Sequence, residues 1–337
     1  STMSLGILLG TILFGPVVDR FGYKWLLVAS SVLALAGLQG LANFREIEML
    51  HASIFCLGLG GGILNGETNA LVSDIYDDDK RGGRLGLLGA FYCVGALLWT
   101  LLNYFIVDYT MPLNAVSVVM AVFILFFMII RFPSAKPTEN LSVKKSLGLL
   151  KYPALLLFAI VLFFESGFEG AQGNFTVSYL CDKGEMSMSS ATLAMTWFTI
   201  GMLVGRLPLG AILGKLGALG TLYSYLSAAL AGVLLLLFGT GSVVSAYLSM
   251  ILIGFGVGAT YPVILNYIGG AFRELSGTAI SIALFIALLG QYAFNKMTGA
   301  AFDAGHQIYL PILLAAAVAS MMVLVPIAVK VSSRMKK

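Results

Sequence analysis

The sequence contains few charged residues. Asp, Glu, Lys and Arg together make up 11% of its 337 residues, whereas a soluble domain carries roughly 25%. A chain so poor in charge cannot cover itself with a polar surface, and its mean hydropathy is correspondingly high, at +0.94. The composition therefore excludes a soluble globular protein and predicts an integral membrane protein.

Cysteine and histidine are also scarce, with three and two copies. Cys56 and Cys93 lie inside apolar runs and Cys181 has no evident partner, so no disulfide framework is indicated. His51 and His306 are expected near the outer face. Because no nucleophile–base pair and no cluster of metal ligands is visible, we expect neither an enzyme nor a protein that holds a metal or cofactor.

Long apolar runs, by contrast, fill the sequence, and many reach the ~20 residues that a membrane-spanning helix needs. Helices fit them better than barrel strands, whose segments are about ten residues long. We therefore predict an all-α membrane protein with eleven spans, at residues 2–19, 23–43, 47–75, 83–107, 112–132, 153–181, 188–213, 217–239, 243–271, 276–301 and 306–332.

The glycines reveal an internal repeat. Residues 6–22 and 201–217 share one pattern of spaced glycines with a basic residue two positions before the last glycine, and the two stretches lie 195 residues apart. The same offset carries Gly95 onto Gly290. An offset of one residue more carries the alternating glycines at 58, 60 and 62 onto those at 254, 256 and 258. Such a repeat in an apolar chain is typical of a secondary transporter built from two similar halves.

The repeat also predicts the organisation of the chain. The second half opens with the span at 153–181, whose counterpart falls before residue 1, so we expect a twelve-helix protein from which this chain lacks the first helix. Helices 2–6 would form an N-terminal bundle at 1–132, and helices 7–12 a C-terminal bundle at 153–337. The connection at 133–152 is expected to be a cytoplasmic linker. Its basic stretch at 144–151 is either a solvated segment or a short amphipathic helix on the membrane surface.

Basic residues predict the orientation, because cytoplasmic loops carry an excess of Lys and Arg. Only Arg45 and Lys183 fall in connections on one side. We expect the other side, and with it the C-terminus, to be cytoplasmic; it carries Arg20, Lys24, Lys80, Arg81, Arg84, Arg131, Lys136, Lys144, Lys145, Lys151, Lys215, Arg273, Lys330, Arg334, Lys336 and Lys337.

The turn Gly15-x3-Asp19-Arg20-x-Gly22-x-Lys24 resembles the signature loop of the major facilitator superfamily, and a weaker copy surrounds Lys215. The resemblance implies two pseudo-symmetric six-helix bundles. We expect Asp19 to face the positive N-terminal end of a helix that opens at Ser276-Gly277-Thr278. This contact would act as a latch on the cytoplasmic side, with Gly15, Asp19, Arg20, Gly22 and Lys215 as gating residues; the alternative is an ordinary basic turn.

Acidic residues inside a membrane are costly and indicate function by default. Glu165 and Glu169 are four residues apart, hence on one helix face, with Gln172 one turn further. Asn174 points elsewhere on an ideal helix, but nearby glycines would allow local unwinding. We expect Glu165, Glu169 and a third acid, Glu67, to couple an ion to transport. The alternative is a structural hydrogen bond or a salt bridge to Arg206.

Further polar and aromatic residues are expected at similar depth. Asn65 and Asn69 share one helix face, and Glu67 lies roughly opposite, where it can pair between helices instead. Amides, carboxylates and aromatic rings around a midplane cavity suit a neutral polyhydroxylated solute. The predicted substrate-binding residues are Asn65, Asn69, Glu169, Gln172, Asn174, Trp197, Tyr261, Asn266, Gln291 and Asn295.

Two segments resemble a narrower group, the fucose–galactose–glucose:proton symporter family. Residues 168–175, Phe-Glu-Gly-Ala-Gln-Gly-Asn-Phe, are similar to its seventh helix, and residues 58–70 to its fourth. The resemblance implies proton coupling through acids on the first and fourth helices. The first helix is missing here, and the fourth-helix acid falls on Asn65, which departs from that pattern. Some relatives couple to sodium instead.

These features lead to one main hypothesis and two alternatives. The main one is symport of a hexose or fucose-like sugar with H⁺ or Na⁺ by alternating access, in a multi-pass protein of the plasma membrane (the inner membrane of a bacterium). Expected partners are the sugar, the coupling ion and lipid, and no nucleic acid. One alternative is a proton-coupled efflux antiporter for drugs or metabolites, although residues 95–100 lack the Gly-Pro signature usual for it. The other is a transporter-like sensor that binds a ligand without moving it.

Overall fold

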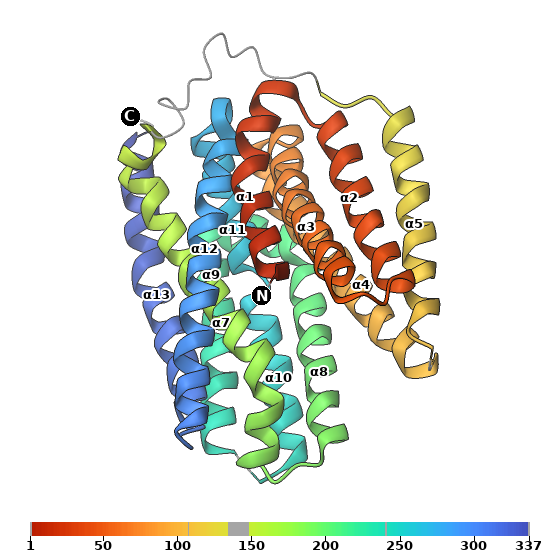
Figure 1. Cartoon of the computed structure of the whole chain (residues 1–337). Coiled ribbons are helices and arrows are strands. Elements are labelled where there is room, and N and C mark those ends of the chain that lie inside the picture. Colours follow the sequence, from red (N-terminus) through yellow and green to blue (C-terminus); the bar gives the residue numbers. More distant parts are fainter. Residues whose placement is uncertain (1, 107, 134–147, 240, 336–337) are drawn as a thin grey trace. The chain divides into compact units, whose positions relative to one another are not determined.

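The computed structural model describes residues 2–106, 108–133, 148–239 and 241–335, and these residues are almost entirely helical (Figure 1). Eleven helices in this part of the chain are long and apolar enough to cross a membrane. The protein is therefore a multi-pass membrane protein, and the predicted number of spans is confirmed.

The chain divides into two compact units. Unit 1 consists of Ser1–Ile75, Leu98–Lys151 and Ile268–Phe285, and unit 2 of Tyr76–Leu97, Tyr152–Tyr267 and Ile286–Lys337. Each unit corresponds largely to one predicted half, except that parts of three helices, in residues 76–97 and 268–285, cluster with the other half.

The helices of the first half are α1 (Thr2–Phe21), α2 (Lys24–Asn43), α3 (Ile47–Ile75), α4 (Asp78–Phe105) and α5 (Thr110–Ile129). Those of the second half are α7 (Pro153–Asp182), α8 (Met188–Arg206), α9 (Leu209–Phe238), α10 (Val243–Val257), α11 (Thr260–Ala271), α12 (Ser276–Asp303) and α13 (Tyr309–Met335). Two 3₁₀ turns, η1 (Leu149–Lys151) and η2 (Arg273–Leu275), precede α7 and α12.

Four spans differ from prediction, one of them the span predicted at 217–239, because α9 already begins at Leu209. The span predicted to begin at residue 83 begins at Asp78 instead, because the carboxylates of Asp78 and Asp79 favour the positive end of the helix. The span predicted to end at residue 213 instead ends at Arg206, because Pro208 has no backbone N–H to continue the helix. The span at 243–271 is broken into α10 and α11.

Close approach of backbones explains the repeated glycines. In unit 1, a Cβ on Gly6 of α1 would lie 2.5 Å from the carbonyl oxygen of Phe55 in α3. In unit 2, a Cβ on Gly201 of α8 would meet the carbonyl oxygen of Ile251 in α10. Both pairs of helices thus pack with hardly any side chain between them, as small residues permit in membranes. The repeat inferred from the sequence is a repeat of this packing.

The final glycine of the repeated pattern has a positive φ in both copies. Gly22, between α1 and α2, has φ = 80°, and Gly217, within α9, has φ = 66°. Residues with a Cβ rarely adopt such values. Gly217 lies at the boundary predicted between two spans, although the helix resumes on both sides of it.

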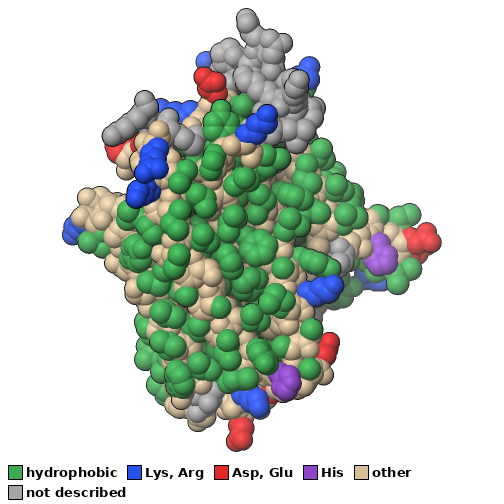
Figure 2. All heavy atoms as spheres, turned by 90° about the vertical axis from the view of Figure 1, so that its left-hand side faces the viewer, with side chains coloured by type: hydrophobic (Ala, Val, Ile, Leu, Met, Phe, Trp, Pro, Cys, Tyr) green, Lys and Arg blue, Asp and Glu red, His purple; other side chains and the backbone are tan. Residues whose placement is uncertain are grey.

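Hydrophobic side chains cover most of the surface visible in Figure 2, and charged side chains lie mainly near its margins. On α5, Val118, Val122, Leu125 and Ile129 form an exposed apolar stripe, as expected for a face in contact with lipid. In the linker, the stretch at 144–151 was considered as an amphipathic helix. Residues 144–147 lie outside the described residues, and residues 149–151 form the 3₁₀ turn η1.

Candidate functional site

The acidic pair lies on α7 in unit 2. Glu165 is fully buried, and its Oε2 accepts a hydrogen bond from Ser166 Oγ at 3.1 Å. The Oε1 atoms of both Glu165 and Glu169 are buried and have no hydrogen-bond partner. Their carboxyl groups are close enough to act electrostatically on each other. A buried carboxyl oxygen without a partner is costly, so this face of α7 is suited to binding an ion or polar ligand.

The guanidinium of Arg206, at the end of α8, acts electrostatically on both carboxyl groups. Among the described residues no ion pair joins it to either of them. Its hydrogen bonds go to backbone instead, from Nε to the carbonyl of Gly258 at 3.2 Å and from Nη1 to that of Gly89 at 3.0 Å. The alternative of a salt bridge to Arg206 is therefore not what the structure shows.

Gln172 lies among methionines. Its Nε2 contacts Met195 Sδ at 3.6 Å and Met250 Sδ at 3.5 Å, and its Oε1 is buried without a partner. Because sulfur is only a weak acceptor, the amide of Gln172 is poorly satisfied as it stands. It therefore stays a candidate ligand for a hydroxylated solute.

Asn174 belongs to a second face of α7. The helix is continuous from Pro153 to Asp182, so the local unwinding expected around its glycines does not occur. Asn174 Nδ2 nevertheless donates to Asn295 Oδ1 of α12 at 2.9 Å. A Cβ on Gly170 would lie 2.5 Å from Gln291 Cγ. The close approach of α7 and α12 thus brings Asn174, Gln291 and Asn295 together.

Trp197, Tyr261 and Asn266 come from other helices of unit 2. The ring of Trp197 on α8 lies 6.2 Å from that of Tyr247, and its Nε1 is buried without a partner. Asn266 on α11 likewise has a buried Oδ1 without a partner. Tyr261, on the same short helix, is half-buried. Unpartnered polar atoms thus occur on α7, α8 and α11.

In unit 1, Asn65 and Asn69 share a face of α3, as predicted. Asn69 Nδ2 donates to the backbone carbonyl of Asn65 at 2.7 Å, and the side chain of Asn65 is exposed. Glu67 is fully buried, and its Oε1 accepts from Ser30 Oγ of α2 at 2.6 Å. This bond is the pairing between helices considered for Glu67. Its Oε2 is buried without a partner, and a role in ion coupling stays a prediction.

The signature loop makes the contact expected of it. The carboxylate of Asp19 accepts hydrogen bonds from Gly277 N at 3.2 Å, Thr278 N at 2.8 Å and Thr278 Oγ1 at 2.6 Å. Gly15 leaves room for this contact, because a Cβ there would lie 2.6 Å from the carbonyl oxygen of Gly277. The buried carboxylate therefore caps the N-terminus of α12, where backbone N–H groups need an acceptor.

Arg20 and Lys215, also predicted to gate, are both exposed. The guanidinium of Arg20 lies 5.2 Å from the ring centroid of Phe21. Arg20 lies in the last turn of α1 and Gly22 follows it with its positive φ, whereas Lys215 lies on α9. The gating role of this set stays a prediction.

A second carboxylate at the start of α12 was missed by sequence reasoning. Asp74, at the end of α3, accepts from Ser276 Oγ at 2.6 Å and from Tyr23 Oη at 2.5 Å. Burial, followed by the nearby Asp74 carboxylate, raises the pKa of Tyr23 well above its ordinary value. The only sequence signal was a polar Ser73-Asp74 pair ending an apolar run, and nothing linked it to a serine 202 residues away.

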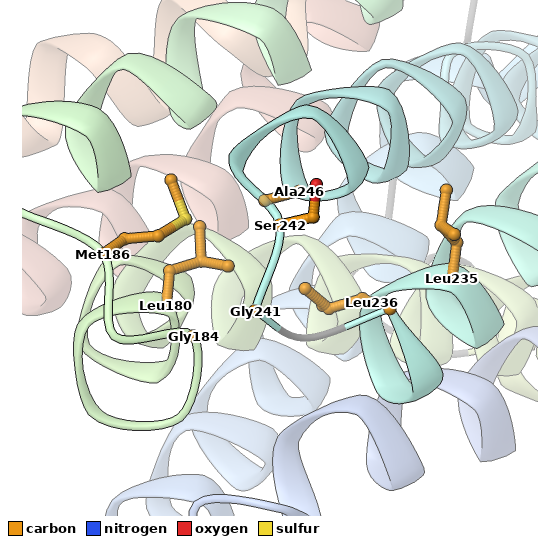
Figure 3. A pocket seen from close by; sticks show the side chains of 9 residues that line it. Leu180, Gly184, Met186, Leu235, Leu236, Gly241, Ser242 and Ala246 are labelled. Carbon is orange, nitrogen blue, oxygen red and sulfur yellow. The ribbon is translucent and has the colours of Figure 1, made fainter.

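Two pockets lie apart from these residues. One, of about 410 Å³, is lined by Leu41, Phe44, Arg45, Leu50, Tyr109 and Leu113 of unit 1. The other, shown in Figure 3, lies in unit 2 between the ends of α7 and α9 and the start of α10. At about 10 Å³ it has room for at most one water molecule. Neither is lined by a predicted substrate-binding residue.

Comparison with protein families decides the classification. The family model of the Major Facilitator Superfamily matches residues 1–294. The chain belongs to this superfamily. Its fold class, two repeated sets of helices in an all-α membrane transporter, is therefore the predicted one.

Individual relatives are distant. The chain is 20% identical to a TsgA homolog of Buchnera aphidicola over 86% of its own length and 74% of that protein. It is 32% identical to a D-xylose transporter of Levilactobacillus brevis, over 31% of its own length and 23% of that protein.

Among solved structures, the E. coli fucose:proton symporter FucP has a TM-score of 0.84, with 16% identity over 97% of this chain and 89% of that one. The human organic anion transporter MFSD10 has a TM-score of 0.81, with 16% identity over 96% of this chain and 82% of MFSD10. At these identities the likeness shows the fold alone.

Proposed function

We propose that this transporter carries a hexose or fucose-like sugar together with H⁺ or Na⁺, by alternating access. The observation that carries the proposal is the face of α7, where Glu165 and Glu169 hold buried, unpartnered carboxyl oxygens one turn from Gln172. Buried ionisable groups in a membrane protein are expensive and mark ion pathways. The fold of the fucose:proton symporter and the similarity to a D-xylose transporter support the substrate class.

The proposal includes the membrane and the orientation. Positive charges on one set of connections support a plasma-membrane protein with its C-terminus in the cytoplasm. In this orientation the contact between Asp19 and the start of α12 lies on the cytoplasmic side and acts as a latch that opens once in each cycle.

An efflux antiporter is the second candidate. The specific observation in its favour is the structural likeness to MFSD10, an organic anion transporter. The guanidinium of Arg206 provides a buried positive charge in unit 2, and a basic group is what an anionic substrate requires. A transport assay in proteoliposomes distinguishes a sugar substrate from an organic anion.

Uptake into proteoliposomes tests the proposal. Labelled fucose, galactose, glucose and N-acetylglucosamine are offered under an imposed proton gradient and then under a sodium gradient. Accumulation of one sugar under one gradient, abolished by dissipating that gradient, is the expected result. If no sugar accumulates under either gradient while a labelled organic anion is expelled, the antiporter is correct.

A further inference from the structure

The break between α10 and α11 has a covalent cause. Pro262 stands four residues after Gly258 and has no backbone N–H, so the carbonyl of Gly258 loses the donor that a continuous helix would supply. In a membrane such a carbonyl must find another donor, because no water replaces it. Arg206 Nε provides it at 3.2 Å.

The same guanidinium joins a third helix. Its Nη1 donates to the carbonyl of Gly89 on α4 at 3.0 Å and contacts Cys93 Sγ at 3.8 Å. Space for it depends on glycine, since a Cβ on Gly89 would lie 2.8 Å from Nη1. Arg206 is only 6% exposed. Within unit 2, Arg206 therefore links α8 to α4 and to the α10–α11 break through hydrogen bonds to backbone carbonyls.

A buried guanidinium also needs a counter-charge. Around the α7 carboxyl pair, the titratable groups that act on it are Arg206 of α8 with Tyr92 and Cys93 of α4. The residues that α12 brings to α7, Gln291 and Asn295, are neutral. The charged residues of α13, Lys330 and Arg334, lie in its last two turns. Lys296, the next residue of α12, is exposed. Among the described residues, Arg206 is thus the buried cation that acts on the pair.

We propose that Arg206 is a positioning residue that couples the protonation of Glu165 and Glu169 to bending at the α10–α11 break. While both carboxyl groups are protonated, the guanidinium remains hydrogen-bonded to the carbonyl of Gly258, and this bond stabilises the break. When a carboxyl releases a proton to water, the carboxylate attracts the guanidinium, and the carbonyl of Gly258 loses its donor. The segment with Tyr261 and Asn266 then bends. This inference rests on the proposed ion coupling and identifies the ion as H⁺.

Hydrogen–deuterium exchange across a pH series tests this without any substrate. In the unaltered protein, amide exchange at residues 258–267, corrected for its intrinsic pH dependence, should rise about tenfold as the pair is deprotonated, the population change expected on losing one charge-assisted hydrogen bond. In the double variant Glu165→Gln, Glu169→Gln, the corrected exchange at residues 258–267 should stay slow at every pH. In Arg206→Gln it should be fast at every pH. A corrected exchange that does not change with pH in the unaltered protein overturns the proposal, as does the same rise in the double variant.

The variant Pro262→Ala tests whether Arg206 stabilises the α10–α11 break through the carbonyl of Gly258. It restores an N–H that can bond to the carbonyl of Gly258, so Arg206→Gln should lower the thermal unfolding midpoint less in this background than alone. Equal losses in both backgrounds would show that Arg206 does not support the break. Both measurements succeed or fail irrespective of whether a sugar is transported, so failure of the proposed function remains a separate result.

Discussion

Asp19 and Thr278 are joined twice, since one carboxylate oxygen accepts both the backbone N–H, at 2.8 Å, and the hydroxyl, at 2.6 Å, of the same threonine. The two residues are 259 positions apart in the chain. The contact combines a helix cap with a charge–dipole interaction, each of which depends on the negative charge of Asp19.

Replacing Asp19 with Asn should impair cycling while substrate binding persists. The amide keeps one acceptor but loses the charge, so the latch weakens by about 1–2 kcal/mol. We expect the turnover rate to fall about tenfold with a nearly unchanged Kd, in transport and binding assays on the same preparation. Asp182→Asn, which alters an exposed carboxylate at the end of α7, is the matched control. A normal turnover rate in Asp19→Asn would remove the latch from the mechanism.

Glu169→Gln should abolish gradient-driven accumulation in a folded protein. Glutamine has the same shape but cannot release a proton, so exchange of sugar across the membrane without a gradient should continue. Counterflow and gradient-driven uptake, measured side by side, separate these two activities. Glu46→Gln, an exposed residue between α2 and α3, controls for loss of an acidic group. Accumulation equal to that of the unaltered protein would exclude Glu169 from ion coupling.

Asn65→Ala and Asn69→Ala should weaken substrate binding more than they reduce expression. Because the side chain of Asn65 is exposed, we expect its removal to affect mainly the complex with substrate. Asn69→Ala also removes the hydrogen bond from Asn69 to the α3 backbone. Removing one hydrogen bond to a solute costs about 1 kcal/mol, so Kd should rise roughly fivefold for each variant. Expression that collapses while the Kd of the remaining protein is unchanged would assign these residues to folding.

Gly62→Ala and Gly61→Ala should change stability in opposite directions. A Cβ on Gly62 would lie 2.5 Å from the carbonyl oxygen of Ile7, whereas nothing lies within 4 Å of one on Gly61. The first change should destabilise by about 1–3 kcal/mol through overpacking. The second should be neutral or stabilise by up to about 1 kcal/mol, because alanine favours helix. Thermal unfolding in detergent compares the two, and equal midpoints would contradict the close packing of α1 on α3.

Tyr23→Phe should make stability less dependent on alkaline pH. The raised pKa of Tyr23 means that the folded protein holds a phenolic proton that the unfolded chain releases near pH 10. Its contribution is therefore fully present below about pH 10 and falls as the pH rises further. The stability advantage of the unaltered protein over the variant should shrink between about pH 9 and 11 in thermal unfolding. An advantage that stays constant over this range would show that Tyr23 ionises normally.

The residues that sequence reasoning placed correctly are those governed by short-range or periodic rules. The spacing of glycines predicted which faces of α1, α3, α8 and α10 approach closely, and the motif around Asp19 predicted its helix-capping contact. Apolar runs predicted most helix bounds within a few residues, since a span must match the thickness of the bilayer.

The misplaced features depend on details that a pattern does not carry. Pro208 and Pro262 each break a span that is apolar throughout, because the missing N–H matters more to the backbone than hydropathy does. The Asp74 site combines Tyr23 and Ser276, which share no motif. Arg206 was considered as an ion-pair partner, whereas it donates to two backbone carbonyls, and one of them, that of Gly258, lacks a helical donor because of the break.

The close packing of glycine on backbone occurs in both halves of the repeat. Within the described residues, α1 packs on α3 and α8 packs on α10 with glycine against backbone, so these contacts leave no room for a side chain. Unit 1 carries no internal interruption in its described spans α1, α2, α3 and α5, whereas the described spans that lie mainly in unit 2 are interrupted near Pro208, Gly217 and Gly258. The interruptions are therefore concentrated in the second of the duplicated halves, where the described helices have the most places to bend.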